Sequence, residues 1–333
     1  MKGPSPAGLI ELAAGHQRAR VLTSLIELGI PTLLGEEPRS RETVAASLGA
    51  EPLAVGLLLE AAARLGVLVR TEGGFANSPA AARFLRRESP DYLGDLLLRH
   101  DRMARSPAWT GFPRRLLEWR AGTSAPVAPE AAPTLAERDG QHRVALLAGE
   151  ALGESFDFST FRLLLDLGGG TGAMSIALCR LHSGLSAIVV ERPEIAAATH
   201  GYVDGAGLRE RIGVRAEDFL NAAPWPEGAD LVLLANVLSM LPAERTRELF
   251  GRIHRYLPRD GAVVLSGLMP SPGGAGGPLE PLLLGLEDIA LGVPDIERPA
   301  EQYMQWLAAA GFRQVRHAAY YPPASMVVGR KSG

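Results

Sequence analysis

The sequence predicts an α/β chain in which a helical N-terminal region precedes a mostly parallel sheet with helices on both faces. Three observations support this fold class. Apolar strands alternate with helices in the second half of the chain, which is typical of a parallel sheet. Residues 312–320 and 325–329 have the pattern of a closing antiparallel hairpin, and the first hundred residues are mainly helical.

The N-terminal region has the pattern of a winged helix. Apolar residues recur at helical spacing over 9–34, and Ser40 is placed to cap a short helix. A longer helix is expected over 53–65, followed by two short strands within 67–77. That longer helix carries one cation, Arg64, whereas a DNA recognition helix needs several. The region is therefore interpreted as a scaffold or a dimer interface.

The middle of the chain is expected to be helical and interrupted. Several prolines break residues 80–150, and 121–133 is the stretch expected to form a surface connection. A helical pattern resumes over 135–152.

From residue 161 onward the pattern changes to alternating strands and helices. A last helix is expected over 300–310, before the hairpin. The strands expected before it are 163–167, 186–191, 212–215, 229–235 and 261–266.

A glycine-rich turn follows the first of these strands, in the sequence Leu163-Leu-Leu-Asp-Leu-Gly-Gly-Gly-Thr-Gly172. Glycine lets the backbone adopt conformations that a side chain would block and lets a ligand approach closely. The next helix directs unpaired N–H groups into the same crevice, so a nucleotide-like ligand is expected there. The spacing Gly168-x-Gly170-x-x-Ala173 also fits a dinucleotide fingerprint. Asp166, by contrast, matches the Asp-x-Gly-x-Gly-x-Gly pattern of S-adenosylmethionine (SAM) methyltransferases.

Composition narrows the class of protein. The net charge of −3 over 333 residues gives no general attraction to nucleic acid, and no apolar run is long enough for a membrane span. The single cysteine, Cys179, excludes an internal disulfide and is interpreted as buried filler. No residue spacing supports a metal site, and no secretory signal is evident. A cytoplasmic protein without nucleic-acid, membrane or metal partners is expected.

Taken together, these residues resemble the small-molecule O-methyltransferase family, which includes plant caffeate-type and bacterial antibiotic-tailoring enzymes. The resemblance covers nearly the whole chain. It implies a homodimer formed through a winged-helix domain, and a class I Rossmann-like domain that binds SAM. The expected division is 1–95 for dimerisation, 96–155 as a helical linker that caps the substrate pocket, and 156–333 for catalysis.

The resemblance also assigns the methyl donor's contacts. Asp166 would hold the methionine end, and Glu191 at the end of the second strand would bind the ribose hydroxyls, a role that suits a bidentate carboxylate. Asp218 would accept a hydrogen bond from the adenine amino group, and Phe219 would pack near the ring. The expected cofactor residues are Asp166, Gly168, Gly169, Gly170, Gly172, Glu191, Arg192, Asp218, Phe219 and Asn236.

The sequence departs from the family where the catalytic base is expected. The family's Asn-Val-Leu-His-Asp-Trp stands here as Asn236-Val-Leu-Ser-Met-Leu241, which places Ser239 at the histidine and Met240 at the acid. A second family acid falls at Ser266, and a third is retained as Glu297. Because a serine hydroxyl has no useful basicity at neutral pH, the identity of the base is open.

Three routes remain open. The acceptor can be nucleophilic already, so that proximity to the sulfonium is enough; His100 or His142 can act instead; or SAM can serve as a fixed cation in a cyclase, pericyclase or hydroxylase. The leading hypothesis is O- or C-methylation of a small, aromatic or enolisable secondary metabolite, and a ligand-responsive winged-helix regulator is a further alternative. His254 is interpreted as part of a solvated helix face. The catalytic candidates are Ser239, Glu297, His100 and His142, and the expected pocket residues are Trp109, Ser239, Met240 and Met269.

Overall fold

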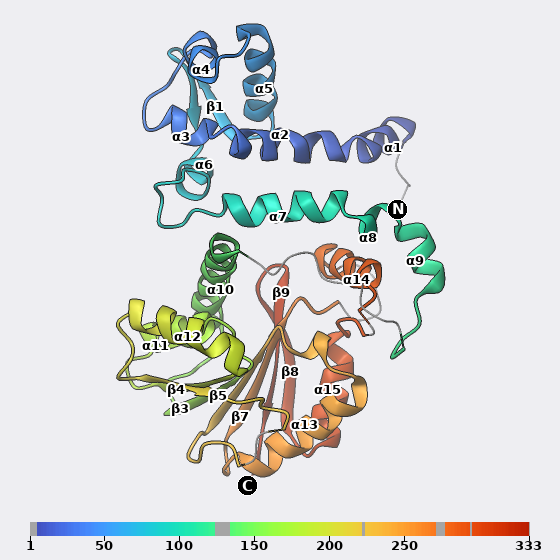
Figure 1. Cartoon of the computed structure of the whole chain (residues 1–333). Helices are drawn as coiled ribbons and strands as arrows, with labels where there is room; N and C mark the ends of the chain where they lie inside the picture. The colour runs from blue at the N-terminus through green and yellow to red at the C-terminus, as the bar shows by residue number, and fades with distance from the viewer. Residues whose placement is uncertain (1–4, 124–133, 222–223, 271–276, 294, 333) are drawn as a thin grey trace. The chain divides into compact units, whose positions relative to one another are not determined.

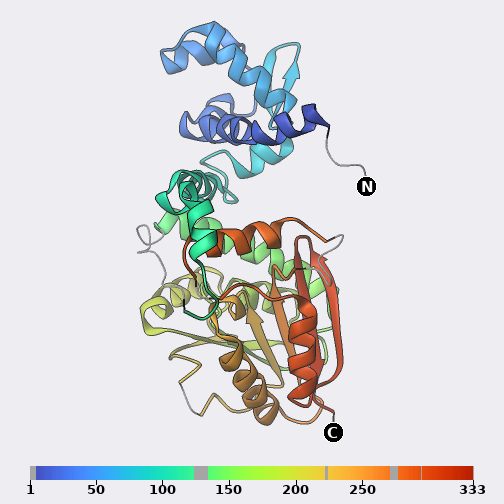
Figure 2. The same ribbon diagram turned by 90° about the vertical axis from the view of Figure 1, so that its right-hand side faces the viewer.

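The computed structural model describes residues 5–123, 134–221, 224–270, 277–293 and 295–332, and its ribbon is shown in Figures 1 and 2. The chain divides into two compact units. The N-terminal unit comprises Met1–Thr110 and Ala131–Arg143, and the C-terminal unit comprises Gly111–Glu130 and Val144–Gly333. The threefold division expected from the sequence, with boundaries at residues 95 and 155, stays a prediction.

The N-terminal unit is built of short helices and one hairpin. Ser40 caps α4 by accepting a hydrogen bond from Thr43 N, and the β1–β2 hairpin is extended by an isolated bridge between Arg39 and Phe75. The winged-helix prediction is therefore confirmed. The elements are α1 (Pro6–Ala13), α2 (Gly15–Glu27), α3 (Ile30–Leu34), α4 (Arg41–Leu48), α5 (Pro52–Arg64), β1 (Leu68–Thr71), β2 (Gly74–Asn77), α6 (Pro79–Phe84), α7 (Gly94–Arg105), α8 (Pro107–Thr110) and the start of α10 (Leu135–Ser155).

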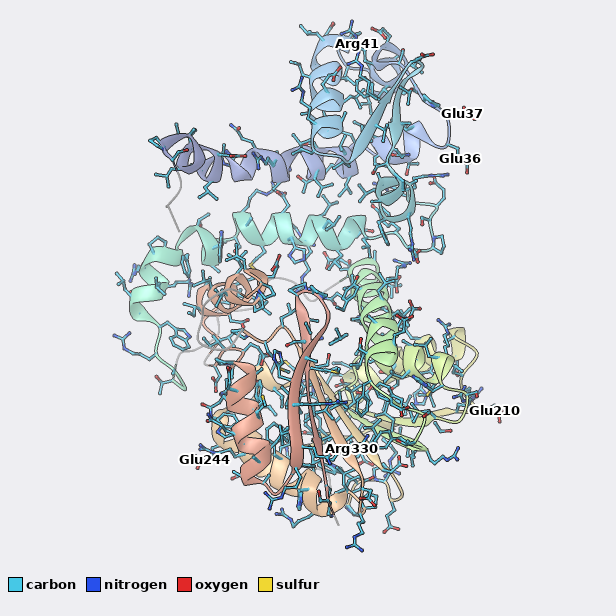
Figure 3. The ribbon with its side chains drawn as sticks, turned by 180° about the vertical axis from the view of Figure 1, so that it is seen from behind. Glu36, Glu37, Arg41, Glu210, Glu244 and Arg330 are labelled. Atoms are coloured by element: carbon cyan, nitrogen blue, oxygen red, sulfur yellow. The ribbon has the colours of Figure 1, made fainter. Side chains whose placement is uncertain are left out.

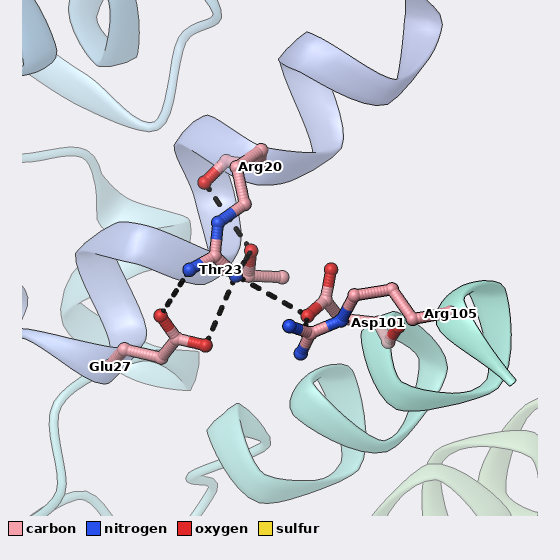
Figure 4. A network of polar contacts seen from close by, with 5 residues as sticks. All are labelled: Arg20, Thr23, Glu27, Asp101 and Arg105. Atoms are coloured by element: carbon pink, nitrogen blue, oxygen red, sulfur yellow. Dashed lines mark hydrogen bonds and ion pairs between the residues drawn. The ribbon is translucent and has the colours of Figure 1, made fainter.

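A polar network joins α2 to α7 within this unit (Figure 4). Arg20 donates to Glu27 on its own helix at 2.7 Å and to Asp101 on α7 at 3.4 Å. Asp101 in turn pairs with Arg105 at 2.5 Å. Arg20, Glu27 and Arg105 are exposed and Asp101 is mostly buried, so the exposed pair of Arg20 with Glu27 adds little to stability.

The C-terminal unit holds the sheet. Its elements are α9 (Phe112–Glu118), the rest of α10, β3 (Leu163–Leu167), α11 (Ala173–Leu181), β4 (Ser186–Glu191), α12 (Pro193–Gly205), β5 (Ile212–Ala216), β6 (Leu231–Ala235), the 3₁₀ turn η1 (Leu238–Met240), α13 (Ala243–Tyr256), β7 (Ala262–Gly267), α14 (Glu280–Ala290), α15 (Ala300–Ala309), β8 (Arg313–Tyr321) and β9 (Ala324–Arg330).

The seven strands are ordered β5-β4-β3-β6-β7-β9-β8. Pairing is parallel from β5 to β7, and β9 is antiparallel to both β7 and β8, which confirms the predicted sheet and hairpin (Figure 1). The chain moves from one side of β3 to the other, and β3 pairs with both β4 and β6. Such a switch point opens a crevice at the carboxyl ends of the strands, where α/β proteins bind ligands.

A separate apolar core covers each face of the sheet. Phe250 on α13 and Tyr303 on α15 belong to one core, and Leu152 on α10 and Leu178 on α11 belong to the other. Cys179 is buried in the second core, and burial raises the pKa of its thiol to about 11, so its interpretation as filler is confirmed.

The expectation for His254 was wrong. Its ring packs edge-on against Phe312, with centroids 5.0 Å apart at 87°, and lies beside Gly311. Burial lowers the pKa of His254, and the nearby Lys331 lowers it further. The charged residues around His254 in the sequence give no sign of this tertiary contact with Phe312, which directly precedes β8.

Charged side chains cover the outside of each unit. Figure 3 shows Glu36, Glu37 and Arg41 on the N-terminal unit and Glu210 and Glu244 on the C-terminal unit, all of them exposed. No single helix in the described ranges is long and apolar enough to cross a membrane; α4 and α5 pass that test only together, bent by 117°.

Candidate functional site

The turn between β3 and α11 depends on glycine. Gly168, Gly170 and Gly172 have φ values of 73°, 58° and 73°, in the left-handed region that other residues avoid. The turn is tied to the sheet because Gly168 N donates to Val190 O at 2.8 Å, and it closes on itself because Gly172 N donates to Gly169 O at 2.8 Å.

The two sides of this turn differ in how much room they leave. A Cβ at Gly168 would lie 2.9 Å from Val237 Cγ2 and 3.2 Å from Phe219 Cε1, and one at Gly169 would lie 2.6 Å from Asp166 Oδ2. A Cβ at Gly170 would meet nothing within 4 Å. The turn is thus packed tightly from behind and open at Gly170, as the close approach of a ligand requires.

Both polar groups of the Gly170 residue are held by the segment that follows the turn. Gly170 N donates to Glu191 Oε2 at 2.9 Å, and Gly170 O accepts from Thr199 Oγ1 at 2.6 Å. Glu191 ends β4 and is only 7% exposed; its other oxygen accepts from Arg192 N at 2.8 Å. Thr199, which sequence reasoning missed, is fully buried on α12. The carboxylate expected to bind a ribose is therefore rigidly placed beside the open glycine.

Asp166 is fully buried below the turn. Its Oδ2 accepts a hydrogen bond from Ser175 Oγ at 2.6 Å, and its Oδ1 has no partner among the residues that the structure describes. Burial raises the pKa of Asp166 to about 6, and the charge of Glu191 adds to the rise while Ser175 opposes it. An unpartnered buried carboxylate oxygen is costly and is suited to a cationic or N–H-bearing ligand group.

Of the two residues expected beside adenine, Phe219 packs against the turn at Gly168. Phe219 is buried and its ring edge touches the space above Gly168. Asp218 accepts from Leu220 N at 2.9 Å and from Asn221 Nδ2 at 2.7 Å. Because an ionised carboxylate has about four lone-pair positions, Asp218 retains capacity for about two more donors.

These groups fit the parts of SAM. The unpartnered oxygen of Asp166 suits an ammonium group, Glu191 suits a vicinal diol, and Phe219 suits the face or edge of a purine. The Arg192 side chain is half exposed and pairs with Glu194 at 3.1 Å, so its contact with a ligand stays a prediction.

A second group of residues lies at the ends of β6 and β7. Asn236 follows β6 with a φ of 54°, and its N–H donates to Ser266 O at 2.8 Å. Asn tolerates this left-handed conformation better than most residues do. Directly after it, η1 carries Ser239, which is half-buried, and Met240, which is 69% exposed.

Glu297 is the buried acid of this second group. Its Oε1 accepts from Tyr303 OH at 2.5 Å and from Arg298 N at 3.2 Å. Burial raises its pKa, and these hydrogen bonds partly oppose the rise. A carboxylate with a raised pKa is a stronger base than an exposed one.

The other oxygen of Glu297 faces the end of β7. Measured from the position of a Cβ on Gly267, Glu297 Oε2 lies at 3.5 Å, Asn236 Oδ1 at 3.7 Å and Met269 Cε at 3.9 Å. Gly267 thus leaves a small space lined by a carboxylate, an amide and a thioether. Tyr303, which holds the carboxylate, was not anticipated from the sequence.

Ser266, which the resemblance places at the family's second acid, does not join this group. Ser266 pairs with Met326 on β9, and the next residue, Gly267, pairs with Ser325. Because successive residues of a strand face opposite sides of the sheet, the Ser266 side chain lies on the face opposite to the one that Gly267 presents to Glu297. There its hydroxyl hydrogen-bonds to Tyr320 OH at 2.7 Å.

The remaining candidates belong to the N-terminal unit. His100 is exposed on α7, His142 lies on α10, and Trp109 lies on α8. Their roles in catalysis or in an acceptor pocket stay predictions. Among the described residues, no group of three histidine, cysteine or acidic side chains could hold a metal ion.

Comparison with known proteins agrees with this geometry. The O-methyltransferase domain family matches residues 128–313, and the O-methyltransferase dimerisation domain family matches residues 10–87. The chain is 30% identical to the 3-hydroxy-5-methyl-1-naphthoate 3-O-methyltransferase of Streptomyces sahachiroi, over 98% of this chain and 96% of that protein. It is 31% identical to the N,N-dimethyltransferase OxyT of Streptomyces rimosus, over 93% and 91% of the two chains.

Solved structures give the same result. Human N-acetylserotonin methyltransferase in complex with SAM superimposes with a TM-score of 0.81, at 25% identity and over the full length of both chains. The SAM-dependent methyltransferase SibL in its apo form also gives a TM-score of 0.81 at 25% identity, over 99% of this chain and 100% of that one.

Proposed function

The chain belongs to the O-methyltransferase family, and on that premise we propose that it methylates a small secondary-metabolite acceptor that is aromatic or enolisable. It is an enzyme that uses SAM as methyl donor. The observation that carries the placement of the donor is the open, left-handed Gly170 between the unpartnered oxygen of Asp166 and the fixed carboxylate of Glu191.

When bound, SAM supplies a methyl group on a sulfonium, which is a good leaving group. The chain's own residues bind SAM and orient it. Asp166 offers negative charge to the methionine ammonium, and Glu191 offers two acceptor oxygens to the ribose. The described residues at the ends of β6 and β7 would hold the acceptor in line with the donor, so proximity and the exclusion of water supply much of the rate.

Proton removal is the step in which this chain differs from its family. Ser239 replaces the family's histidine and has no adjacent base to activate it within the described ranges. Glu297 is the buried acid of the second group, and its Oε2 lies 3.5 Å from the position of a Cβ on Gly267 at the end of β7. We assign Glu297 the role of holding the acceptor's hydroxyl or enol and accepting its proton, for acceptors that are acidic enough to need only a carboxylate.

The chemistry of the acceptor follows from this weak base. A carboxylate removes a proton readily from an acidic phenol or an enolisable carbonyl compound and poorly from an unactivated alcohol. The names of two relatives, a naphthoate 3-O-methyltransferase and a tetracenomycin 8-O-methyl transferase, support a small secondary metabolite as the acceptor. The relative OxyT is named an N,N-dimethyltransferase, so the family alone does not fix the acceptor atom.

The test is a transfer assay with SAM labelled in its methyl group. Purified chain is incubated with a panel of hydroxynaphthoates, acidic phenols and β-dicarbonyl compounds, with simple alcohols as controls. Labelled product together with an equal amount of S-adenosylhomocysteine is expected for the acidic acceptors. Acceptor that is altered without S-adenosylhomocysteine being formed would contradict methyl transfer and favour a cyclase or hydroxylase.

A homodimer formed through the N-terminal domain is part of this proposal. The dimerisation-domain match supports self-association, and α1 has no buried residue within the chain while exposing Leu9, Ile10 and Leu12. Such an apolar helix is suited to packing against a second copy. Changing these three side chains to Gln should convert the dimer to a monomer by light scattering, and an unchanged dimer would remove α1 from the interface.

A further inference from the structure

The carbonyl of Phe219 is held by two side chains that sequence reasoning did not single out. Trp225 Nε1 donates to Phe219 O at 3.0 Å, and Arg252 Nη1 donates to the same oxygen at 3.1 Å. Arg252 Nη1 also donates to Leu220 O at 3.0 Å. One guanidinium from α13 therefore fixes two consecutive peptide groups of the loop that follows β5.

These two side chains also hold each other. The Arg252 guanidinium carbon lies 3.9 Å from the centroid of the Trp225 ring, which is a close cation–π contact. Trp225 is 4% exposed and meets Tyr256 edge-on, with centroids 5.4 Å apart. Burial lowers the pKa of Arg252, and the charge of Arg255 lowers it further, so this guanidinium is partly withdrawn from water. It stays charged, and its bonds to the carbonyls are charge-assisted.

The loop after β5 contacts the glycine turn through the ring of Phe219. Phe219 Cε1 lies 3.2 Å from the position of a Cβ on Gly168, so the ring is packed against the glycine turn. A shift of the Phe219 backbone would therefore move the ring and the adjacent Asp218 together. Neither Arg252 nor Trp225 belongs to the group around Gly267 and Glu297, where the acceptor is proposed to bind.

We propose that Arg252 and Trp225 are positioning residues that fix Phe219 and Asp218 for the adenosine half of SAM, and so set donor affinity separately from the methyl-transfer step. This inference rests on the proposed function, because it takes the glycine turn as the donor site. It predicts that disturbing the pair weakens every adenosine-bearing ligand by a similar factor and leaves the acceptor group unaffected.

The decisive variant is Arg252→Gln, which removes the charge and the fork of donors but keeps a long polar side chain. Arg255→Gln is the matched control, because Arg255 is an exposed arginine on the same helix that makes none of these contacts. Dissociation constants for S-adenosylhomocysteine are measured by calorimetry and those for adenosine by competition, with kcat and KM for SAM alongside. Circular dichroism and a thermal melt establish that each variant is folded.

Arg252→Gln should raise the dissociation constants of both ligands roughly tenfold or more, with kcat at saturating SAM within about twofold of wild type. Trp225→Phe keeps an aromatic side chain but replaces the indole by a smaller phenyl ring and loses the N–H, so it should raise them by roughly fivefold. Arg252→Lys should recover part of the affinity. Asp166→Asn should weaken S-adenosylhomocysteine without weakening adenosine.

Two results would overturn the inference. One is equal affinities in folded Arg252→Gln and Arg255→Gln; the other is a fall in kcat with donor affinity unchanged. If Arg252→Gln does not fold, the same comparison is made with Trp225→Phe and Arg252→Lys. Wild-type protein that binds no S-adenosylhomocysteine would instead overturn the proposed function, which separates the two failures.

Discussion

Gly170 and Glu191 are joined by a 2.9 Å hydrogen bond from the glycine N–H to the carboxylate Oε2. The glycine turn after β3 and the acid at the end of β4 therefore form one unit, although 21 residues separate them in the chain. Thr199 completes that unit by binding the carbonyl of the same glycine. The proposed donor site is thus held by hydrogen bonds within the chain itself, which is expected to reduce the ordering cost of binding.

Glu191→Gln tests this unit. The amide has one acceptor oxygen, so one of the two backbone N–H groups that now meet a carboxylate oxygen would face an NH₂ donor instead. The donor's diol would also lose an ionised acceptor. We expect SAM affinity to fall roughly 10- to 100-fold by calorimetry. Glu194→Gln, an exposed change three residues after the end of β4, is the control and should leave the affinity within about twofold.

Asp166 is expected to make donor binding depend on pH. Its pKa is raised to about 6, so below that pH the group proposed to meet the cationic end of SAM becomes neutral. The dissociation constant of SAM should therefore rise as pH falls through about 6, by at most roughly tenfold per unit. Calorimetry of wild type and Asp166→Asn between pH 5 and pH 8 checks this. The same pH dependence in both proteins would contradict it.

The same carboxyl gives a signature in folding stability. The pKa of Asp166 in the folded protein, about 6, exceeds the ordinary value of 3.8. Its contribution to the free energy of unfolding is therefore fully present below pH 3.8 and is lost as pH rises through 6. Asp166→Asn removes this dependence. Relative to wild type, the variant should gain about 3 kcal/mol in free energy of unfolding over that window, as measured by urea titration at several pH values. A flat difference would show that the group titrates normally.

Glu297 and Tyr303 are expected to control how kcat rises with pH on the acidic side of its pH profile, the acidic limb. Burial raises the pKa of Glu297, so kcat should rise with pH as this carboxyl ionises. Tyr303→Phe removes a hydrogen bond that favours the carboxylate, so the limb should move to higher pH. Glu297→Gln should abolish the limb and lower kcat roughly 100-fold. The control is Glu301→Gln on α15, and a full acidic limb in Glu297→Gln would exclude the assigned role.

Ser239 should matter little to the rate. Its hydroxyl is no base, so Ser239→Ala should keep kcat within about threefold on an acidic acceptor. Ser239→His, which introduces the residue that the resemblance implies at this position, should extend activity toward less acidic phenols. A loss of 100-fold or more in Ser239→Ala, in a folded protein, would show that the hydroxyl takes part directly.

The sequence predicts most of this fold because its strands and its glycine turn are local patterns. Asp166, Gly170 and Glu191 stand at strand ends, where topology alone brings them together. The residues that support them were not predictable in the same way. Ser175, Thr199 and Tyr303 act through side chains packed across elements, and neither hydropathy nor spacing marks them.

The difference between local pattern and tertiary packing also explains why the prediction for His254 was wrong and why Arg252 and Trp225 were not anticipated. His254 has charged neighbours in the chain but packs on Phe312, a contact that exists only once α13 meets the start of β8. Arg252 and Trp225 look like an exposed cation and an isolated aromatic until the loop after β5 closes on them. Sequence pattern gives the ends of the strands; tertiary packing decides which side chains hold them.

The most direct test of the donor site compares Gly170→Ala with Gly49→Ala. Both glycines have a left-handed φ, 58° and 64°, and a Cβ on either would meet nothing within 4 Å, so both changes should cost a similar 1 to 2 kcal/mol of backbone strain. Gly49 ends α4 in the N-terminal unit, whereas Gly170 opens onto the crevice. Calorimetry with SAM should show at least a tenfold loss of affinity for Gly170→Ala and wild-type affinity for Gly49→Ala. Equal SAM affinity in the two variants would contradict the placement of the methyl donor at this turn.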